Sequence, residues 1–325
     1  MAVNIKGRSL LSLKDFTRDE IQHLIDGAIE FKRLKRAGIF PRNLEHRNIA
    51  VIFLKASCRT RTAVAVAAAD EGANVEFLPH EEIRFGKKES VRDVARVLGR
   101  MFDGIAFRGF EHSMIEELAK SAGVPVWNCL CDQYHPTQVL ADFMTIQEEF
   151  GRLAGVRVAY VGDGRNNMAR SLVIGAIKLG VDLRIVAPTP LQLDLDSLAS
   201  VYSPAPGETG RVRMTSDLKE GLADCDIVYG DVWVSMGEED LVDERIALLR
   251  DYKVTSEVMA LTKNPAAIYL HCLPSLHDLE TEFGREHPDA LEVSDEVFEG
   301  PFSRVFDQAE NRMHAQNALL IHIVG

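Results

Sequence analysis

The segment FLKASCRTRTAVAV, residues 53–66, places several anion-binding groups between an apolar run and an alanine-rich run. We expect the apolar run to form a buried strand and residues 61–69 to form a helix. A helix N-terminus exposes unpaired N–H donors and carries about half a positive charge. Ser57 and Thr60 add hydroxyls, and Arg59 can bind a phosphate through two parallel hydrogen bonds. The segment predicts a phosphate-binding loop without the glycines of a P-loop. A Ser57 that only caps the helix, with the arginines in solvent, would give the same pattern.

Polar side chains of catalytic types recur where other predicted strands end. In a parallel sheet, ligands bind beyond the carboxyl ends of the strands, so a site is expected there. Taken alone, His135 would be a buried structural histidine and Cys272 a core residue. Asp163 would be a turn residue, and Asp231 would cap a loop. Because such residues recur at several strand ends, a ligand site is favoured over these separate explanations. The residues are Arg108 in AFRGF, His135 and Gln138 in DQYHPTQ, Asp163, Asn166 and Asn167 in VGDGRNNM, Asp231, Ser235 and Met236 in DVWVSMGE, and His271 and Cys272 in YLHCLP.

Strands and helices alternate along the sequence, as is typical of βαβ units and a parallel sheet. In the first half we expect strands at 48–55, 73–78, 103–108 and 124–128 and helices at 19–38, 61–69, 89–101 and 114–123. A long helix over 135–151 connects to a second half, with strands at 155–163, 181–188, 225–230 and 266–274 and helices at 167–180 and 308–325. The pattern predicts an α/β protein with two doubly wound parallel-sheet domains, joined by interdomain helices, and an active site in the cleft.

Composition narrows the classes of function. The chain of 325 residues has a formal net charge of −12, which argues against a general nucleic-acid-binding protein because phosphate backbones attract basic surfaces. Its five cysteines are irregularly spaced, which suits a reducing compartment rather than a disulfide framework. Cys129 and Cys131 do not form a CxxC pair, so we expect no metal. The start of the sequence lacks a signal-peptide core, and no run approaches the ~20 apolar residues of a membrane span. We expect a cytoplasmic protein without nucleic-acid or membrane partners.

Together these motifs resemble the carbamoyltransferases, and specifically the ornithine carbamoyltransferases. SCRTR is similar to that family's STRTR carbamoyl phosphate loop, and HPTQVLAD to the motif that opens the helix between its domains. DVWVSMGE resembles the ornithine-side loop, HCLP the loop with the reactive cysteine, and FDQAENRMH the C-terminal helix that carries Arg312. The similarity covers essentially the whole chain in the same order. SMG with HCLP is specific for ornithine as the acceptor.

The resemblance implies transfer of a carbamoyl group from carbamoyl phosphate to the δ-amine of L-ornithine, which gives L-citrulline and phosphate without a cofactor. It implies a homotrimer with active sites at the subunit boundaries. The implied domains are a carbamoyl phosphate-binding domain at 1–134, an interdomain helix at 135–150, an ornithine-binding domain at 151–304 and a C-terminal helix at 305–325 that returns to the first domain. The motifs are the same for synthesis and for breakdown of arginine, so they assign no direction.

The implied site residues fall into two sets. In the carbamoyl phosphate set, Ser57, Cys58, Arg59 and Thr60 hold the phosphate, Arg108, His135 and Thr60 donate to the carbamoyl oxygen, Gln138 lies near the carbamoyl amide, Arg312 closes the anion site, and Cys272 and Leu273 border the ligand. In the ornithine set, Asn167, Asp231, Ser235 and Met236 bind the amino-acid end, and Cys272 lies next to the δ-amine with Leu273 beside it. The implied catalytic residues are Arg108, His135, Asp231 and Cys272.

Three residues depart from the family pattern. Cys58 replaces a threonine, so a weak thiol donor stands where a hydroxyl would bind phosphate. Leu54 replaces a glutamate, and Arg84 replaces a glutamine that reaches the neighbouring subunit's phosphate. The segments FLK, IRFGKKES, AFRGFEH and YVGDGRNNM together resemble the phaseolotoxin-insensitive ornithine carbamoyltransferases. Because the departures surround one ligand group, we hypothesise a modified phosphate site with reduced sensitivity to inhibitors that mimic the bound substrates.

Other functions fit the sequence less well. A carbamoyltransferase for another amine, such as putrescine, would not need the intact Asn167, Asp231 and SMG set, because a diamine has no α-carboxylate. A non-catalytic paralogue is the alternative from another class, but Arg59, His135 and Cys272 are all retained. A nucleotide-binding oxidoreductase would need a complete glycine fingerprint followed by an acidic ribose ligand, and the sequence shows neither.

Overall fold

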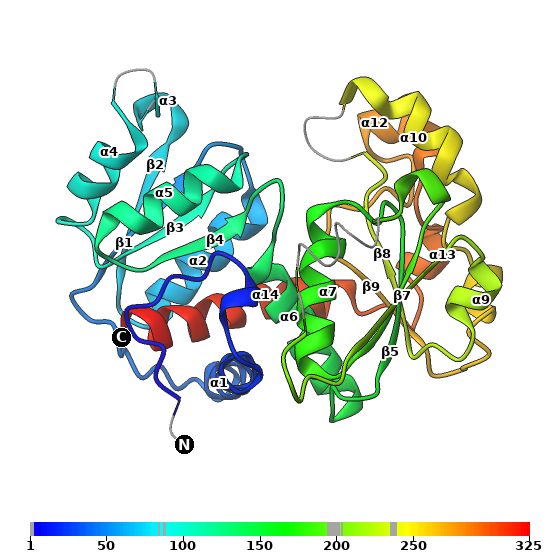
Figure 1. Ribbon diagram of the computed structural model, residues 1–325, viewed down its shortest axis with the longest axis horizontal. Helices are drawn as coiled ribbons and strands as arrows, with labels where there is room; N and C mark the ends of the chain where they lie inside the picture. Colours follow the sequence, from blue (N-terminus) through cyan, green and yellow to red (C-terminus); the bar gives the residue numbers. More distant parts are fainter. Residues whose placement is uncertain (1–2, 84, 87–88, 194–201, 203, 235–238) are drawn as a thin grey trace. The chain divides into compact units, whose positions relative to one another are not determined.

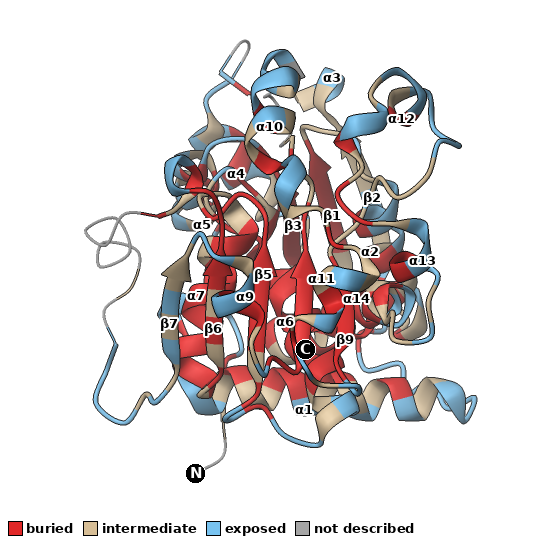
Figure 2. Cartoon of the chain, turned by 90° about the vertical axis from the view of Figure 1, so that its right-hand side faces the viewer, coloured by how far each residue is buried: buried red, intermediate tan, exposed pale blue. Residues whose placement is uncertain are grey.

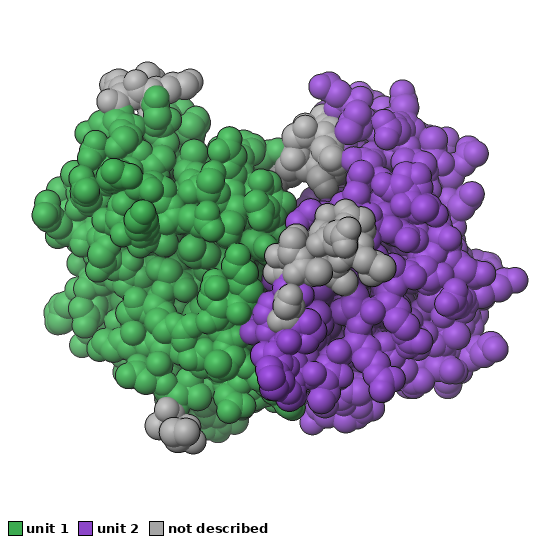
Figure 3. All heavy atoms as spheres, viewed as in Figure 1, with its two compact units in different colours: residues 1–148, 310–325 green, residues 149–309 purple. Residues whose placement is uncertain are grey.

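The computed structural model describes residues 3–83, 85–86, 89–193, 202, 204–234 and 239–325 (Figure 1). The chain divides into two compact units, which Figure 3 shows in green and purple. Unit 1 contains residues 1–148 and 310–325, and unit 2 contains residues 149–309. Both boundaries fall inside helices, since α6 spans Pro136–Phe150 and α14 spans Val305–Leu319. No helix among the described residues is long and apolar enough to cross a membrane.

Unit 1 is built on a four-stranded parallel sheet in the order β2-β1-β3-β4. The strands are β1 (Asn48–Phe53), β2 (Asn74–Pro79), β3 (Gly104–Arg108) and β4 (Val126–Leu130). The helices are α1 (Arg18–Arg36), α2 (Cys58–Asp70), α3 (His80–Ile83), α4 (Val91–Leu98), α5 (His112–Ala122), α6 and α14, which is followed by a π-helical turn at Leu320–Val324. The central strands β1 and β3 are almost wholly buried, as expected for strands with helices on both faces of the sheet.

Unit 2 repeats this architecture with a five-stranded parallel sheet in the order β7-β6-β5-β8-β9. The strands are β5 (Arg157–Val161), β6 (Asp182–Val186), β7 (Arg211–Thr215), β8 (Ile227–Gly230) and β9 (Ile268–His271). The helices are α7 (Asn167–Leu179), α9 (Leu218–Leu222), α10 (Val242–Leu249), α11 (Ser256–Ala260), α12 (Glu282–Glu286) and α13 (Asp295–Phe298). The predicted fold class of two parallel-sheet α/β domains is confirmed.

Each sheet has a point at which the strand order reverses. In unit 1, β1 lies between β2 and β3, and in unit 2, β5 lies between β6 and β8. Ligands of doubly wound folds bind beyond the carboxyl ends of the strands at such switch points. The segments that leave these ends are 54–57 and 109–111 in unit 1 and 162–166 and 231–234 in unit 2. These segments carry or adjoin most of the polar site residues that the sequence predicts.

Two sequence predictions need correction. Helix α2 begins at Cys58 rather than at Arg61, so the phosphate motif itself forms the first turn of the helix. Strand β7 was not predicted, because RVRMT is an edge strand whose exposed positions carry arginines instead of a continuous apolar run. Figure 2 shows this strand in tan and pale blue beside the buried strand β6.

A buried polar network fixes α14 within unit 1. Lys32 donates to Glu148 at 2.9 Å and to Asn311 at 2.8 Å. The Asn311 amide donates to Thr145 at 2.9 Å and to Glu148 at 2.8 Å. These bonds join α1, α6 and α14, and they hold the next residue after Asn311, which is Arg312, in a defined place.

Burial lowers the pKa of four histidines of unit 1, which predicts acid-induced loss of stability. The histidines are His112, His135, His314 and His322, and the pKa of His322 falls to about 4. In the unfolded chain each would titrate near ~6.5, so the unfolded state takes up protons first as the pH falls. Stability is therefore fully present above ~6.5 and decreases below it, by at most ~1.4 kcal/mol per histidine per pH unit.

Urea unfolding at pH 7 and pH 5 tests this prediction. The chain has two tryptophans, Trp127 in unit 1 and Trp233 in unit 2. In a Trp233→Phe variant the fluorescence of Trp127 reports on unit 1, and the midpoint should move to lower urea at pH 5. A midpoint of unit 1 that does not change with pH would contradict the prediction.

Candidate active site

The motif SCRTR at residues 57–61, which is predicted to bind phosphate, surrounds the N-terminus of α2 in unit 1. Ser57 stands at the N-cap position, but its hydroxyl accepts no capping hydrogen bond. The alternative in which Ser57 only caps the helix is therefore not supported. Arg61 is engaged elsewhere, because its guanidinium lies 3.8 Å from the centroid of the Phe77 ring. Arg59 and Cys58 are exposed at the helix start.

Three arginines from distant parts of unit 1 lie close to the buried imidazole of His135. Burial lowers the pKa of His135 well below its usual value, and the charges of Arg312, Arg108 and Arg59 lower it further. His135, Arg108 and Arg312 are each less than a tenth exposed. Guanidinium groups remain charged at any pH of interest, so they repel one another and the imidazole stays neutral. The arrangement favours an anionic ligand next to a neutral N–H donor.

Arg312 also contacts the phosphate motif directly. Its Nη2 donates to the hydroxyl of Thr60, which is completely buried. A hydroxyl that accepts one hydrogen bond still has its own proton to donate. Thr60 can therefore donate to a ligand oxygen while Arg312 holds it in place.

The turn before α6 positions His135. Backbone N–H of Cys131 donates to the carbonyl of Tyr134 at 3.0 Å. The Cys131 thiol accepts from the Asn128 amide at 3.2 Å and from the Tyr134 N–H at 3.4 Å. Sequence reasoning did not identify Asn128 and Cys131 as site-forming residues, since nothing in their spacing marks a sulfur that closes a turn. Gln138, one turn into α6, donates to Asp142 at 2.9 Å.

In unit 2, Asp231 is the centre of a hydrogen-bond network at the end of β8. Its Oδ2 accepts from the Tyr160 hydroxyl at 2.8 Å and from the Asn166 amide at 2.7 Å. Its Oδ1 accepts from the Cys272 thiol at 3.1 Å and from the Val232 N–H at 2.9 Å. Asp231 is 2% exposed, and its charge together with burial raises the pKa of Tyr160 well above the usual value. The network brings together the ends of β5, β8 and β9.

Asn167, Cys272 and Leu273 are half-buried in unit 2, so each leaves part of its surface for a ligand. Asn167 is the first residue of α7, whose N-cap Asn166 accepts from the Ala169 N–H at 2.9 Å. Tyr160 was not among the predicted site residues, although it holds Asp231. Three predicted residues, Arg84, Ser235 and Met236, lie outside the described residues.

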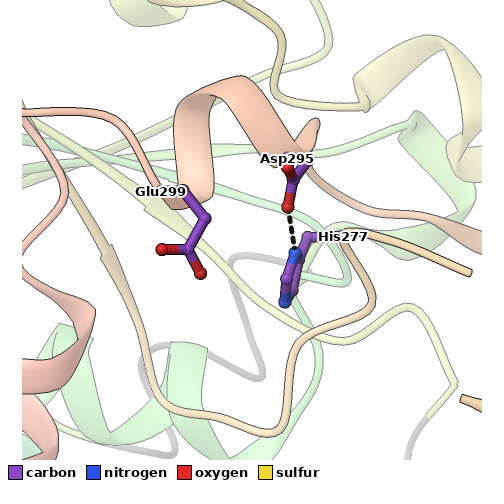
Figure 4. A group of neighbouring side chains, drawn as sticks. All are labelled: His277, Asp295 and Glu299. Carbon is purple, nitrogen blue, oxygen red and sulfur yellow. Dashed lines mark hydrogen bonds and ion pairs between the residues drawn. The ribbon is translucent and has the colours of Figure 1, made fainter. Parts of the chain in front are cut away.

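Among the described residues, one group has the side-chain types and spacing to hold a metal ion. It consists of His277, Asp295 and Glu299 in unit 2, whose ligand atoms lie within 4.8 Å of one another (Figure 4). His277 Nδ1 is 2.7 Å from Asp295 Oδ1, and the imidazole stacks on Phe298 with the ring centroids 3.8 Å apart. Asp295 and Glu299 are exposed. The hydrogen bond and the stacking account for the position of the imidazole, and we assign the group no metal.

Comparison with known proteins identifies the class to which this fold and these residues belong. The carbamoyl-P binding domain of the aspartate/ornithine carbamoyltransferases matches residues 8–148, and their Asp/Orn binding domain matches residues 154–323. The chain belongs to the aspartate/ornithine carbamoyltransferase family.

Relatives within this family cover the chain almost completely. It is 56% identical over 321 residues to a phaseolotoxin-insensitive ornithine carbamoyltransferase 2 of Pseudomonas syringae pv. actinidiae, covering 99% of this chain and 98% of the relative. It is 49% identical over 328 residues to a catabolic ornithine carbamoyltransferase of Bacillus licheniformis, covering 99% and 98%. The structure of ornithine carbamoyltransferase from Pyrococcus furiosus superposes with a TM-score of 0.91 at 39% identity, covering 100% of this chain and 99% of the other.

Proposed function

We propose that this protein transfers the carbamoyl group of carbamoyl phosphate to the δ-amine of L-ornithine and releases L-citrulline and phosphate. The observation that carries the proposal is the group of three guanidiniums around the neutral His135, beside the N-terminus of α2. Such a group suits a ligand that carries a phosphate and a polarisable carbonyl. Membership of the carbamoyltransferase family supports the same reaction.

In the proposed mechanism, the carbamoyl phosphate set holds and polarises the first substrate. Ser57, Arg59 and the N–H groups of α2 bind the phosphate, and Arg312 closes the anion site. Arg108, His135 and Thr60 donate to the carbamoyl oxygen, where negative charge develops as the amine attacks. One preorganised donor of this kind is worth about 3 kcal/mol in the transition state. Because His135 is neutral, it donates an N–H without having to release a proton.

The ornithine set is proposed to orient the second substrate. Asn167 and Asp231, with Ser235 and Met236, bind the amino-acid end, and Cys272 and Leu273 lie next to the δ-amine. This amine has a pKa near ~10 in water and must lose a proton before it attacks. Removing water and aligning the nitrogen with the carbamoyl carbon supplies much of the remaining acceleration. The tetrahedral intermediate collapses by breaking the bond between carbon and phosphate oxygen, and the leaving phosphate takes the proton that the attacking nitrogen loses.

The test is citrulline formation from carbamoyl phosphate and ornithine, with putrescine and aspartate as parallel acceptors. We expect turnover with ornithine and a kcat/KM for the other acceptors lower by at least ~10²-fold, since buried polar groups would lose their partners. Preference for putrescine would instead support the alternative in which the acceptor is a diamine. Absence of turnover with every acceptor would support a non-catalytic paralogue.

We propose further that the chain acts as a homotrimer in the cytoplasm, with Arg84 reaching a neighbouring subunit's phosphate site. All five cysteines are free thiols, which suits a reducing compartment. Sedimentation of the purified protein tests the assembly. Mixtures of the inactive Arg59→Ala variant with Arg84→Gln protein test whether sites are shared. Activity above that of the Arg84→Gln protein alone is expected only if a site combines residues from two subunits.

Reduced sensitivity to bisubstrate inhibitors is proposed from the three departures around the phosphate site. Leu54 lies beside Arg108, because its N–H donates to the Arg108 carbonyl at 2.9 Å. The apolar side chain of Leu54 contributes no charge at this position, where a glutamate would contribute a negative one. Cys58 presents an exposed thiol at the first position of α2. These changes alter the phosphate environment while the carbamoyl donors are retained.

Restoring the family residues should restore sensitivity to an inhibitor with a phosphorus-containing group. A Leu54→Glu, Cys58→Thr variant is expected to bind such an inhibitor at least about tenfold more tightly, a change of ~1.4 kcal/mol. Leu279→Glu is the matched control, because Leu279 is an exposed leucine in unit 2. Inhibition constants are measured against carbamoyl phosphate. A wild-type inhibition constant equal to that of an ordinary family member would rule the hypothesis out.

A further inference from the structure

A buried histidine and a buried carboxylate lie behind the reactive-cysteine segment of unit 2. His271 is the last residue of β9, and its side chain is completely buried. Glu292 is 2% exposed, and its Oε1 lies 3.4 Å from the Nε2 atom of His271. Neither residue belongs to the substrate-binding sets described above, so burial of this pair needs a reason.

Hydrogen bonds from the backbone fix the tautomer of the imidazole. The N–H of Leu273 donates to Nδ1 of His271 at 2.9 Å, so Nδ1 carries no proton. In the neutral ring the proton is then on Nε2, which faces Glu292. The Glu292 carboxylate in turn accepts from the Leu276 N–H at 2.6 Å. The pair therefore holds the chain on both sides of Pro274.

This support matters because the segment has a strained backbone. Leu273 has φ = 58°, in the left-handed region that side chains other than glycine rarely adopt. Such a conformation costs roughly 1–2 kcal/mol and persists only when surrounding contacts enforce it. The residue before it, Cys272, donates to Asp231 at 3.1 Å. A change in the conformation of Leu273 would move the thiol and the adjoining carbonyl group.

A second anchor acts on the strand end from α14. The His271 N–H donates to the Gln308 side chain at 2.9 Å, and the Gln308 amide donates to the Tyr229 hydroxyl at 3.3 Å. The Glu292 carbonyl accepts from the Val254 N–H at 2.9 Å, which fixes the carboxylate's own backbone. His271 and Glu292 are thus rigid supports whose side chains accept hydrogen bonds from the N–H groups of Leu273 and Leu276.

We propose that His271 and Glu292 are positioning residues for the ornithine half of the reaction. They hold Leu273 in its left-handed conformation and so fix Cys272 and Leu273 where the δ-amine must be aligned. The inference rests on the proposed function for the identity of the acceptor. The geometry of the segment is independent of that identity.

Substitutions of the pair should change ornithine kinetics without changing carbamoyl phosphate binding. In His271→Leu the Leu273 N–H loses its acceptor, and in Glu292→Leu the Leu276 N–H loses its acceptor. We expect each to raise the KM for ornithine and lower kcat, with kcat/KM falling by about 10²-fold, because a displacement near 1 Å has effects of that size. The Kd for carbamoyl phosphate should change less than about twofold, since the residues proposed to bind its phosphate and carbonyl groups lie in unit 1 and Cys272 and Leu273 only border the ligand.

Two controls separate positioning from general destabilisation. In His271→Asn the amide oxygen can replace Nδ1 as the acceptor for Leu273, so activity should be partly restored relative to His271→Leu. Thr262→Val removes a buried hydroxyl of unit 2 that donates to the Met259 carbonyl at 2.8 Å, before β9 begins. It should lower the urea midpoint to a similar extent but leave the KM for ornithine unchanged.

A measurement without turnover tests the geometry directly. The rate of Cys272 alkylation by iodoacetamide, mapped by mass spectrometry, should change at least about threefold in Glu292→Leu and His271→Leu, since thiol reactivity follows its local environment. Alkylation of the exposed Cys58 in unit 1 is the internal standard. Unchanged Cys272 alkylation together with unchanged ornithine KM would overturn the inference. A wild-type protein that forms no citrulline would overturn the proposed function instead, while the alkylation result would still decide the positioning role.

Discussion

Arg59→Ala is expected to lower kcat/KM for carbamoyl phosphate by about 10³-fold or more. Arg59 is exposed at the start of α2, where its guanidinium can make two hydrogen bonds to a phosphate, each charged bond being worth about 1.5–3 kcal/mol. Its charge also contributes to the low pKa of His135, which places it in the same cationic group as Arg108 and Arg312. The loss should appear mainly as weaker binding of carbamoyl phosphate.

Steady-state kinetics with carbamoyl phosphate as the varied substrate provide the measurement. Arg61→Ala is the matched control, because it removes the same charge only two residues from Arg59. The guanidinium of Arg61 packs on Phe77. That control should lose less than about tenfold, since a cation–π contact is worth about 0.5–1 kcal/mol at an exposed site. Near-normal turnover in Arg59→Ala would remove the central assignment of the phosphate site.

Asp231→Asn is expected to lower kcat/KM for ornithine by about 10³-fold and to leave the affinity for carbamoyl phosphate unchanged. Both carboxylate oxygens accept hydrogen bonds, from Tyr160 and Asn166 on one side and from Cys272 and Val232 on the other. An amide must direct its NH₂ group at one of these pairs of donors. The substitution therefore removes a negative charge near the proposed α-ammonium site and leaves buried donors unpaired, which costs about 1–3 kcal/mol for each group.

Asp226→Asn, at the opposite end of the same strand, is a matched control. Asp226 precedes β8 and accepts from the Arg157 N–H at 2.9 Å, whereas Asp231 follows β8. The control should lower stability but change the KM for ornithine by less than about twofold, since sites that share no partners act independently. Equal kinetic losses in both variants would show that Asp231 acts through the stability of unit 2 rather than at the substrate.

Much of the fold could be predicted because the central strands are continuous apolar runs bounded by polar turns. NIAVIF in β1 and RVAYV in β5 are examples, and both are buried along almost their whole length. The edge strand β7 was not predicted because its alternate exposed positions carry arginines, which are typical of a loop. The strand order and its reversal points depend on which strands pair, and a single sequence does not encode that pairing locally.

The same distinction applies to the site. Residues at the carboxyl end of a strand could be found from the sequence because topology places them at the sheet edge. Arg108, which ends β3, and Asp231, which follows β8, are examples. Tyr160 could not be found in this way, since its contact with Asp231 depends on the parallel register that places Tyr160 opposite Tyr229. His271 and Glu292 are 21 residues apart in the sequence, and their contact depends on the tertiary structure, including the bridge between Val254 and Val293 next to Glu292.

Unit 1 is discontinuous in the chain, and this has a consequence for synthesis on the ribosome. Domains generally fold from the N-terminus as the chain emerges, so β1–β4 and α2 are available early. Arg312, however, reaches Thr60 across 252 residues of sequence. A nascent or prematurely terminated chain therefore has the phosphate loop but lacks one of its three guanidiniums. The proposed anion site is therefore complete only in chains whose synthesis has passed residue 312.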